Sequence, residues 1–523
     1  MKKYKIKSAI IALAGLIVAS CGNDFLTIQS TGRVEAGGPA TEDAIQSAVV
    51  SAYQILLFDS YANYNYNSVL LMSDLRSDDI YKGGESAGDQ RQLYDLAIFR
   101  STSEATIGGL WSIYYTGIAR CNYALLSVNN AVDGIDQNRL KRYAAEALFL
   151  RAYYGHLLWK FWGNVPYFTE ALTEPFVSPQ FKADEVYAKI MEDIKAAEDL
   201  NILPMKVPNG EEGRVSRAAL LMLKARVVLY QKDASRYTET ANDMASIITS
   251  DNYRLFDDFA AMWEESGEFC IESIFESNQL PQGKGWGAAW QGYGTNLPAY
   301  ISPNNLDDPN GVFKGGWGFG PVRPSVLNIF ENGDTRLEGS VNDWRGGKYN
   351  PRFQDTGLAQ RKYAARNGYN SPPGDQDLNY ANNLRIFRYA ETLLNYAELV
   401  GVMGVAPQQG VNAQNCLNQV RNRAFKGTAP ALPLNAENIK SERRKEFIGE
   451  GMRFWDLIRW GDAVRVLTET VTEATPGTED AESVTWTWSR TFTEAKKYLP
   501  IPIANIQTTM GTEYPMEQNP GWD

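Results

Sequence analysis

Large flat side chains gather in one glycine-rich stretch of the chain, residues 283–320. Trp286, Trp290, Tyr293 and Trp317 stand there among glycines. The stretch has neither the 3.6-residue period of a helix nor the alternation of a strand, and glycine readily takes backbone angles that other residues avoid. It is therefore predicted to be a long loop that carries rings. Such a loop either presents its rings to a ligand or packs them against the body of the protein.

A second group of candidate residues lies earlier in the chain and is polar. Asp74, Arg76 and Asp79 belong to an acidic segment that leads into glycines, and Asn65 lies in the polar aromatic run before it. Carboxylate, guanidinium and amide groups can fix the orientation of a bound molecule. The alternatives for the acidic segment are a solvated loop or a calcium-type site built from oxygen ligands.

Catalytic chemistry finds little support in the residue types. The chain has one histidine, His156, in the middle of the longest expected helix. A His-rich zinc site or a Ser-His-Asp triad is therefore not expected, and His156 is predicted to pack. No GxSxG elbow, Walker loop or GxGxxG after a strand is present. A glycosidase needs only two carboxylates at a set separation, so with 62 acidic residues that class stays open.

Helices are expected to position these loops. Apolar residues recur at helical spacing in residues 41–58, 111–132, 138–162, 184–200, 216–231, 237–250, 384–402, 413–425 and 437–449. Consecutive helices joined by short connections are typical of stacked helical hairpins, as in tetratricopeptide solenoids, although the strict repeat consensus is missing.

The helical pattern is interrupted between residues 251 and 383. Glycine, proline, asparagine and aromatic residues are frequent there, and only residues 324–332 are expected to form a short helix. Near the C-terminus, residues 482–492 alternate and place Trp486 and Trp488 on one face, which predicts a strand. The predicted fold is mainly α: a tetratricopeptide-like scaffold of helical hairpins with a large irregular, loop-rich insertion and a small β element near the C-terminus.

Composition limits the partners of the chain. With 523 residues, 44% hydrophobic and 22% charged, it has the composition of an ordinary globular protein. The net charge of −11 argues against nucleic acid as a partner, since nucleic acid requires a basic surface. Cys121, Cys270 and Cys416 are far apart and odd in number, so no disulfide scaffold is expected.

The first residues have the pattern of a bacterial lipoprotein signal. Four early lysines precede an apolar run, residues 9–18, that is too short to span a bilayer. The sequence VASC at 18–21 resembles a lipobox, with valine where leucine is usual. Residues 1–20 are predicted to be the signal peptide, Cys21 the lipidated N-terminus, and residues 21–40 a linker to the folded body. The alternative is an ordinary secretory signal with a chance cysteine.

Three stretches carry a recognisable pattern: YAAEALFLRAYYGHLLWKFWGNVPYF at 143–168, RYAETLLNYAE at 388–398 and RRKEFIGEGMRFWDLIRWG at 443–461. Together with the lipoprotein signal and the ending YLPIPIANIQ…EQNPGW, they resemble the SusD/RagB family of outer-membrane lipoproteins from Bacteroidetes, in the family order. The three stretches themselves are interpreted as scaffold. Arg444 and Arg453, for example, are expected to pair with acids of neighbouring elements or with exposed carbonyl groups.

The resemblance implies a non-catalytic protein that binds oligosaccharides. Family members are lipid-anchored in the outer membrane, face the cell exterior, and deliver their ligand to a TonB-dependent, SusC-like transporter barrel. It implies a single domain at 41–523, with the helical scaffold at 41–250 and 384–523 and the ligand-binding insertion at 251–383. No cofactor and no metal are expected.

A sugar as ligand would give the two groups of candidates complementary roles. Sugars present C–H groups on the faces of their rings and hydroxyl groups at the edges. The four rings of residues 283–320 are predicted to supply flat contact, and Asp74, Arg76, Asp79 and Asn65 the polar contacts. If this is right, the four rings should lie together and partly exposed on one face. If they are buried, they pack the loop and the site lies elsewhere.

Two other classes of protein remain open at this stage. A lipid-anchored α-helical glycoside hydrolase would turn over a glycan, and changing one carboxylate would abolish that turnover while binding persists. A tetratricopeptide-type lipoprotein that binds peptides or serves as a scaffold would show no saccharide affinity.

Overall fold

The structure is a computed structural model of the 523-residue chain. It describes residues 38–58, 60–62, 65–281, 283–287, 290, 294–370, 373–478 and 482–522. The predictions for Cys21 and Tyr293 fall outside the described residues.

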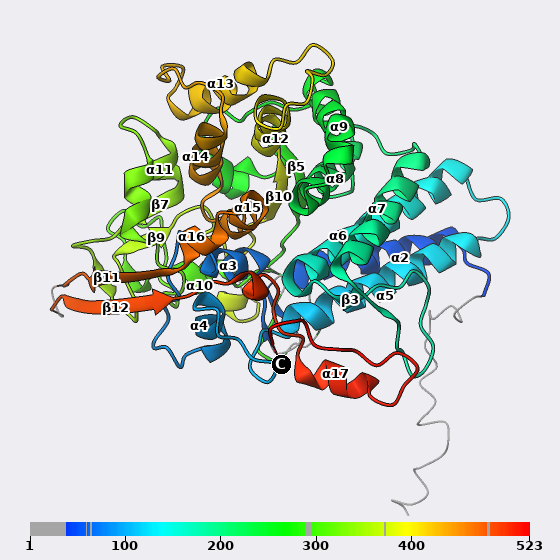
Figure 1. The fold of residues 1–523 in the computed structure, drawn as a ribbon, viewed down its shortest axis with the longest axis horizontal. Helices are drawn as coiled ribbons and strands as arrows, with labels where there is room; N and C mark the ends of the chain where they lie inside the picture. Colours follow the sequence, from blue (N-terminus) through cyan, green and yellow to red (C-terminus); the bar gives the residue numbers. More distant parts are fainter. Residues whose placement is uncertain are drawn as a thin grey trace, which may run out of the picture.

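Helices that are consecutive in the chain pack side by side and form the scaffold of the molecule (Figure 1). In the first half these are α2 (Glu42–Tyr53), α5 (Gly109–Asn129), α6 (Gln137–Trp162), α7 (Ala183–Asp199), α8 (Arg217–Gln231) and α9 (Tyr237–Thr249). The stack continues with α12 (Tyr389–Gly401), α13 (Ala413–Ala424), α14 (Ala436–Phe447), α15 (Arg453–Trp460) and α16 (Ala463–Leu467). The predicted fold class, a mainly helical scaffold with small β elements, is confirmed.

The longest helix, α6, shows how local sequence sets these elements. Asp136 caps its N-terminus by accepting hydrogen bonds from two backbone N–H groups of the first turn. Gly163, with φ +67°, ends it in a conformation that favours glycine. Gly117 of α5 lets the two helices approach closely, because a Cβ there would lie 2.5 Å from the ring of Tyr154 on α6. His156 is buried in this helix, as predicted.

Short strands, rather than an irregular loop alone, organise the segment between the two helical halves. β5 (Ser273–Ser277) pairs with β10 (Leu384–Arg388), β6 (Asn304–Asp307) with β8 (Lys348–Asn350), and β7 (Val341–Asp343) with β9 (Leu358–Gln360), all antiparallel. Helical turns lie between them: α10 (Leu297–Ile301), η6 (Pro324–Ile329), α11 (Arg336–Ser340) and η7 (Gln376–Leu378). The sequence analysis predicted one short helix in this segment and none of these strands. Strands of three to five residues are too short to show a clear alternation of apolar and polar residues.

Small elements complete the molecule. Near the N-terminus are η2 (Gln54–Phe58), β1 (Tyr61–Ala62), β2 (Asn65–Tyr66), α3 (Val69–Leu75) and α4 (Arg91–Ala97). Further along are β3 (Val165–Pro166), β4 (Gln180–Phe181), η3 (Ala234–Arg236), η4 (Ala261–Trp263), η5 (Glu265–Gly267), η8 (Glu494–Lys496) and α17 (Ile503–Thr509).

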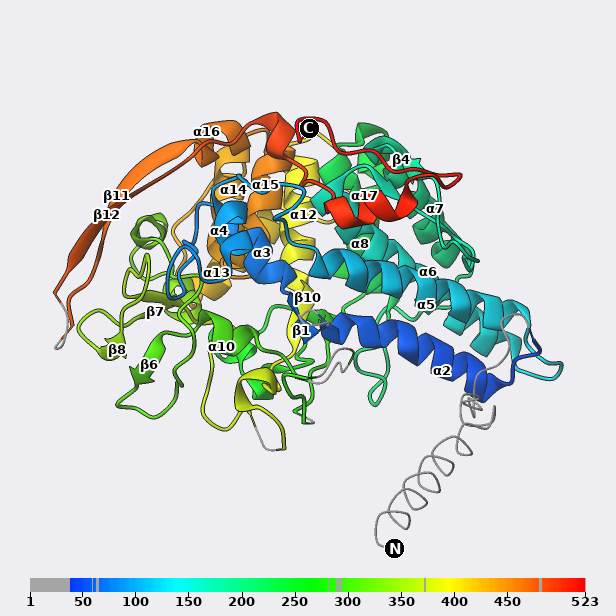
Figure 2. The same ribbon diagram turned by 90° about the horizontal axis from the view of Figure 1, so that it is seen from below.

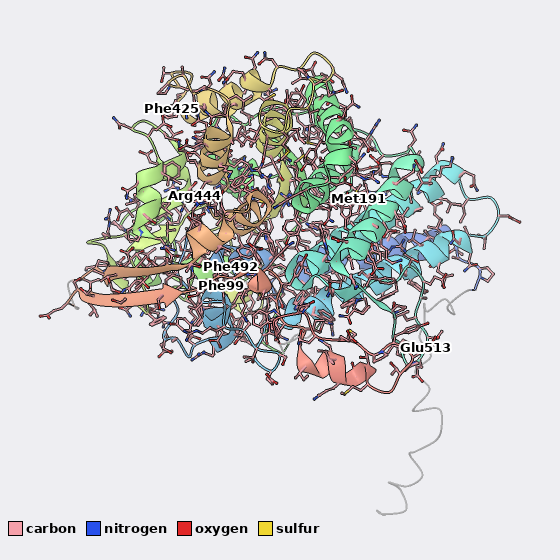
Figure 3. All side chains as sticks on the ribbon, viewed as in Figure 1. Phe99, Met191, Phe425, Arg444, Phe492 and Glu513 are labelled. Carbon is pink, nitrogen blue, oxygen red and sulfur yellow. The ribbon has the colours of Figure 1, made fainter. Side chains whose placement is uncertain are left out.

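The C-terminal β element is a long two-stranded hairpin, β11 (Glu469–Thr475) with β12 (Val484–Arg490). The predicted strand at 482–492 is thereby confirmed. Figure 2 shows the hairpin curving from α16 along one side of the molecule, past β7 and β8. Its base is fixed by Phe492, whose ring lies 5.0 Å from that of Phe99 (Figure 3).

One large hydrophobic core connects the helical scaffold with the short strands. Cys121 and Cys416 are buried and Cys270 is half-buried, and all three are free thiols. Among the helices that the structure describes, none has the length and apolar character needed to cross a membrane.

Candidate functional site

Two of the predicted aromatic residues meet at the surface. The rings of Trp286 and Trp317 stack with centroids 5.9 Å apart and planes inclined by 27°. Tyr66 of β2 meets both edge-on, at 6.2 Å and 5.7 Å. Trp286 is 40% exposed, while Trp317 and Tyr66 are half-buried. We call these three rings the aromatic platform.

A buried layer of rings supports the aromatic platform from below. Tyr61 lies 5.2 Å from Trp286, and its hydroxyl group donates a hydrogen bond of 2.9 Å to the Trp286 carbonyl. Tyr300 of α10 contacts Trp317 at 5.0 Å and rests on Phe319 at 4.6 Å. Edge-to-face contacts of this kind stabilise ring pairs beyond their buried area. Because the lower rings are buried and packed against the upper ones, they hold the orientation of the upper rings in the absence of a ligand.

Carboxylates border the platform and fix its indoles. Trp286 donates its Nε1–H to Asp375 Oδ2 at 2.6 Å, and Trp317 donates its own to Asp377 Oδ2 at 3.0 Å. Both acids flank Gln376 in η7, and Gln376 accepts a hydrogen bond from the Lys314 ammonium. Since both indole N–H groups are already engaged, the indoles offer their faces, and the surrounding carboxylates and amides offer polar contacts.

Tyr66 stays protonated at this site. Burial raises the pKa of its phenol, and so do the nearby Tyr61, Asp89 and Asp375. The hydroxyl group of Tyr66 therefore remains a hydrogen-bond donor at neutral pH, beside the rings of Trp286 and Trp317.

Asn379 and Lys284 hold the loop that carries Trp286. Asn379 accepts hydrogen bonds from the backbone N–H groups of Gly283 and Lys284, at 3.1 Å and 2.8 Å, and donates to the Lys284 carbonyl at 2.8 Å. The Lys284 side chain is buried, and its ammonium donates to the Gly294 carbonyl at 2.9 Å. The Lys284 side chain therefore connects the two ends of the loop, residues 284 and 294.

The buried ammonium gives this loop a pH dependence. Burial lowers the pKa of Lys284 to about 7, whereas an unfolded lysine has a pKa of about 10.4. Between these values the unfolded chain binds more protons, so stability rises with pH. Compared with Lys284→Met, the wild type should gain about 1 kcal/mol of unfolding free energy per pH unit between about pH 7 and pH 10. Urea titrations of both proteins measure this, and parallel pH profiles would contradict it.

Trp290 and Asn65 lie at the margins of the site. Trp290 is 38% exposed, and its described ring contact is with Phe58, edge-on at 5.4 Å, away from the stacked pair. Asn65 is exposed on β2 beside Tyr66, paired with Ala62 across the hairpin. Asn65 therefore stays a candidate polar contact at the edge of the platform.

The structure corrects the expectation for Asp74, Arg76 and Asp79, because all three side chains are buried. Asp79 accepts a hydrogen bond of 2.8 Å from Arg444, which is labelled in Figure 3. Asp74 accepts from the backbone N–H of Gly451 at 3.2 Å. These side chains point into the scaffold and are out of reach of a ligand at the surface.

Arg76 and Asp78 are also held by residues from the C-terminal part of the chain. Arg76 donates to the carbonyls of Lys496 and Lys497, and its guanidinium lies 3.9 Å from the centre of the Phe454 ring. Asp78 pairs with Arg453 at 2.7 Å. Burial alone would raise the pKa of Asp78, but Arg444 and Arg453 hold it below its usual range. The expected pairing of Arg444 and Arg453 with acidic residues is thereby confirmed. Among the described residues, no cluster of three or more Asp, Glu, His or Cys side chains is placed to hold a metal ion.

Comparison with known proteins agrees with this architecture. Residues 41–229 match the family described as "Starch-binding associating with outer membrane", and residues 329–522 match the SusD family. The chain is 60% identical to surface glycan-binding protein A from Bacteroides fluxus, covering 92% of this chain and all of that chain with a TM-score of 0.86. The chain belongs to the SusD family.

Other SusD-family structures resemble it over nearly the same length. Surface glycan-binding protein A from Bacteroides thetaiotaomicron, in complex with laminarihexaose, is 36% identical, with 92% and 100% of the two chains covered and a TM-score of 0.82. A laminarin-binding SusD-like protein is 28% identical at the same coverage, with a TM-score of 0.79. Among curated proteins, SusD-like protein P38 of Formosa agariphila is 25% identical over 507 residues, which covers 89% of this chain and 94% of that protein.

Two residues of the site had no signal in their own segments. Asp375 and Asp377 lie 89 and 60 residues from the indoles they bind, in a stretch that reads as an ordinary polar loop. The polar aromatic run around Tyr66 did offer a signal, because its tyrosine rings are natural packing partners for the tryptophans.

Proposed function

We propose that the protein is a non-catalytic cell-surface glycan-binding protein whose ligand is a laminarin-type, β-1,3-linked glucan oligosaccharide. The observation that carries the proposal is the stacked, partly exposed pair of Trp286 and Trp317 with carboxylates at its edge. One similar structure is a complex with laminarihexaose and another is a laminarin-binding SusD-like protein, which supports this choice of glucan.

Binding would combine stacking on the indole rings with polar contacts at the edge of the platform. The C–H face of a glucose ring lies against an indole, which offers a large rigid contact at little cost in conformational entropy. The ring hydroxyl groups then lie at the level of Asp375, Asp377 and the Tyr66 hydroxyl. A sugar whose hydroxyl groups point elsewhere leaves these polar groups without partners, so they discriminate between glycans.

Isothermal titration calorimetry against a panel of hexasaccharides tests the proposal. Laminarihexaose should bind, and cellohexaose and maltohexaose should bind at least about tenfold more weakly, a difference of about 1.4 kcal/mol. Laminarihexaose recovered after long incubation should be intact. Shortened products would favour a glycoside hydrolase, and the absence of affinity for every glycan would favour a peptide-binding lipoprotein.

We also propose that the protein is lipidated on Cys21, is anchored in the outer membrane facing the exterior, and passes its ligand to a TonB-dependent, SusC-like transporter. The lipobox-like sequence at 18–21 and the description of the matched family support the anchor. Proteinase K treatment of intact cells should degrade the wild type. Cys21→Ser should leave the membrane fraction, and an unchanged distribution would contradict the anchor.

A further inference from the structure

A second cleft, separate from the aromatic platform, lies between the C-terminal hairpin and residues 351–354. Its volume of about 410 Å³ is within the range of small-molecule sites, roughly 300–1000 Å³. The β11–β12 hairpin forms one wall, with Thr475, Val484 and Trp486. The other wall consists of Tyr94 of α4 and the segment with Arg352 and Gln354. We call this space the hairpin cleft.

Aromatic rings line the hairpin cleft from both walls. Tyr94 and Phe353 meet edge-on at 5.8 Å, and both are half-buried. Trp486, also half-buried, rests edge-on against Tyr81 at 4.9 Å. Rings that are held by neighbours yet partly exposed are the same feature that the aromatic platform presents. The cleft therefore offers flat apolar contact in a fixed orientation.

Two buried polar atoms in the walls lack partners. Among the described residues, Gln354 Oε1 and Trp488 Nε1 have no hydrogen-bond partner, although the side chains are only 4% and 5% exposed and both residues line the cleft. Buried polar groups in folded proteins are nearly always paired. The backbone of Gln354 is also held at φ +56°, a conformation that residues other than glycine seldom adopt. The wall of the cleft thus contains an acceptor and a donor that the folded protein leaves unpaired.

The hairpin cleft is linked to the aromatic platform by one short stretch of chain. Arg352 lines the cleft, and its guanidinium reaches toward the Trp317 carbonyl at 3.5 Å. Next to it, the Phe353 N–H donates to the Gly84 carbonyl at 3.0 Å, and the Gly84 N–H donates to the Gly318 carbonyl at 2.8 Å. Figure 2 shows the hairpin on the flank of the segment that contains α10, which underlies the platform.

We propose that the hairpin cleft is a second saccharide subsite, which binds another segment of the polysaccharide held by the aromatic platform. This inference rests on the proposed glycan-binding function. Rings supply the faces, and Gln354, Arg352 and Thr475 supply polar contacts. A hexasaccharide held on the platform gains little from the cleft, whereas a long chain can engage both sites and is bound more tightly through a raised effective concentration.

Variants of the cleft wall test the inference. Trp486→Ala removes a ring, and Gln354→Gly removes the polar side chain while keeping a residue that favours φ +56°. Each should weaken binding of laminarin polymer roughly five- to tenfold in affinity electrophoresis, while the calorimetric affinity for laminarihexaose changes less than about twofold. Trp486→Phe should retain most of the polymer affinity. Thr485→Ala, at an exposed residue of the same strand that does not line the cleft, is the matched control and should behave as the wild type.

Hydrogen–deuterium exchange of the wild-type protein tests the same inference without relying on a variant that folds. Saturating laminarin should protect the backbone at 351–354 and 484–490. The inference is overturned if laminarin leaves both segments unprotected, or if folded Trp486→Ala and Gln354→Gly bind the polymer as tightly as the wild type. A protein that binds neither hexasaccharide nor polymer refutes the proposed function itself, which is a different result.

Discussion

Replacing Trp286 by alanine should weaken laminarihexaose binding by about 30-fold or more, the equivalent of about 2 kcal/mol. Trp286 forms the exposed half of the stacked pair, and 40% of its surface is accessible. The substitution removes the flat face and leaves the Asp375 carboxylate without its indole partner. Because the ring lies at the surface and is 40% exposed, the fold should survive, and calorimetry on the purified variant gives the loss directly.

Trp317→Ala should weaken binding to a similar extent, with an added cost in stability. Its ring is half-buried against Tyr66 and Tyr300, so the substitution also leaves a gap in the support of the platform. We expect a loss of about 1–3 kcal/mol in unfolding free energy. Thermal denaturation separates the loss of binding from the loss of stability.

Trp290→Ala is the matched control for these substitutions. Trp290 is the same residue type in the same loop and has nearly the same exposure, but its described ring contact is with Phe58. Its removal should change laminarihexaose affinity less than about threefold, under 1 kcal/mol. If Trp286→Ala binds laminarihexaose normally and Trp290→Ala loses most of its affinity, the binding site lies around Trp290 and not on the aromatic platform.

The second large effect concerns the scaffold that carries the site. Glu446 is buried in α14, where it accepts a hydrogen bond of 2.6 Å from Arg388, pairs with Arg423, and lies 3.4 Å from Arg336. Glu446→Gln should lower the unfolding free energy by about 3–5 kcal/mol. Its charge offsets three buried guanidinium groups, and each of them would lose one carboxylate partner. Their remaining partners, Glu272, Glu450, Asp334 and Glu442, would then have to balance the cluster without it. Urea denaturation at neutral pH measures the loss.

The acid response of the wild type provides an independent test of the same cluster. Burial alone would raise the pKa of Glu446, but Arg423, Arg388 and Arg336 hold it below its usual range. A depressed carboxylate pKa stabilises the fold above the unfolded value of about 4.3, and this contribution is lost as pH falls below it. Glu446→Gln should therefore lose less stability than the wild type between about pH 5 and pH 3.

Glu437→Gln is the matched control for Glu446→Gln. Glu437 lies exposed in the first turn of the same helix, where a negative charge interacts only with the helix dipole, at about 0.3–1 kcal/mol. Its replacement should cost under about 1 kcal/mol. Equal losses in the two variants would mean that the buried cluster is not what stabilises the scaffold.

Much of the helical scaffold follows from local sequence, because a helix is specified by residues three and four positions apart. The longest helix was expected at 138–162 and spans Gln137–Trp162. β5 went unpredicted, and residues 384–388, expected as the start of a helix at 384–402, form β10 instead. Each strand is five residues long and its partner lies more than a hundred residues away. Only the tertiary structure reveals such pairs.

The polar half of the site was beyond local reasoning for the same physical reason. Asp79 reads as part of a solvated acidic loop until Arg444, 365 residues later, is placed against it. Conversely, Asp375 and Asp377 have no distinctive pattern until the chain brings them to the indoles. The aromatic half could be predicted because large rings among glycines are unusual in themselves. Even so, sequence did not separate the stacked Trp286 from Trp290.

A crystal structure of the protein with laminarihexaose tests the central claim most directly. The saccharide should lie across Trp286 and Trp317, with a glucose ring against an indole face and hydroxyl groups within hydrogen-bond distance of Asp375 or Asp377. Saccharide bound only elsewhere, with the stacked pair uncovered, would contradict the assignment of the aromatic platform as the binding site.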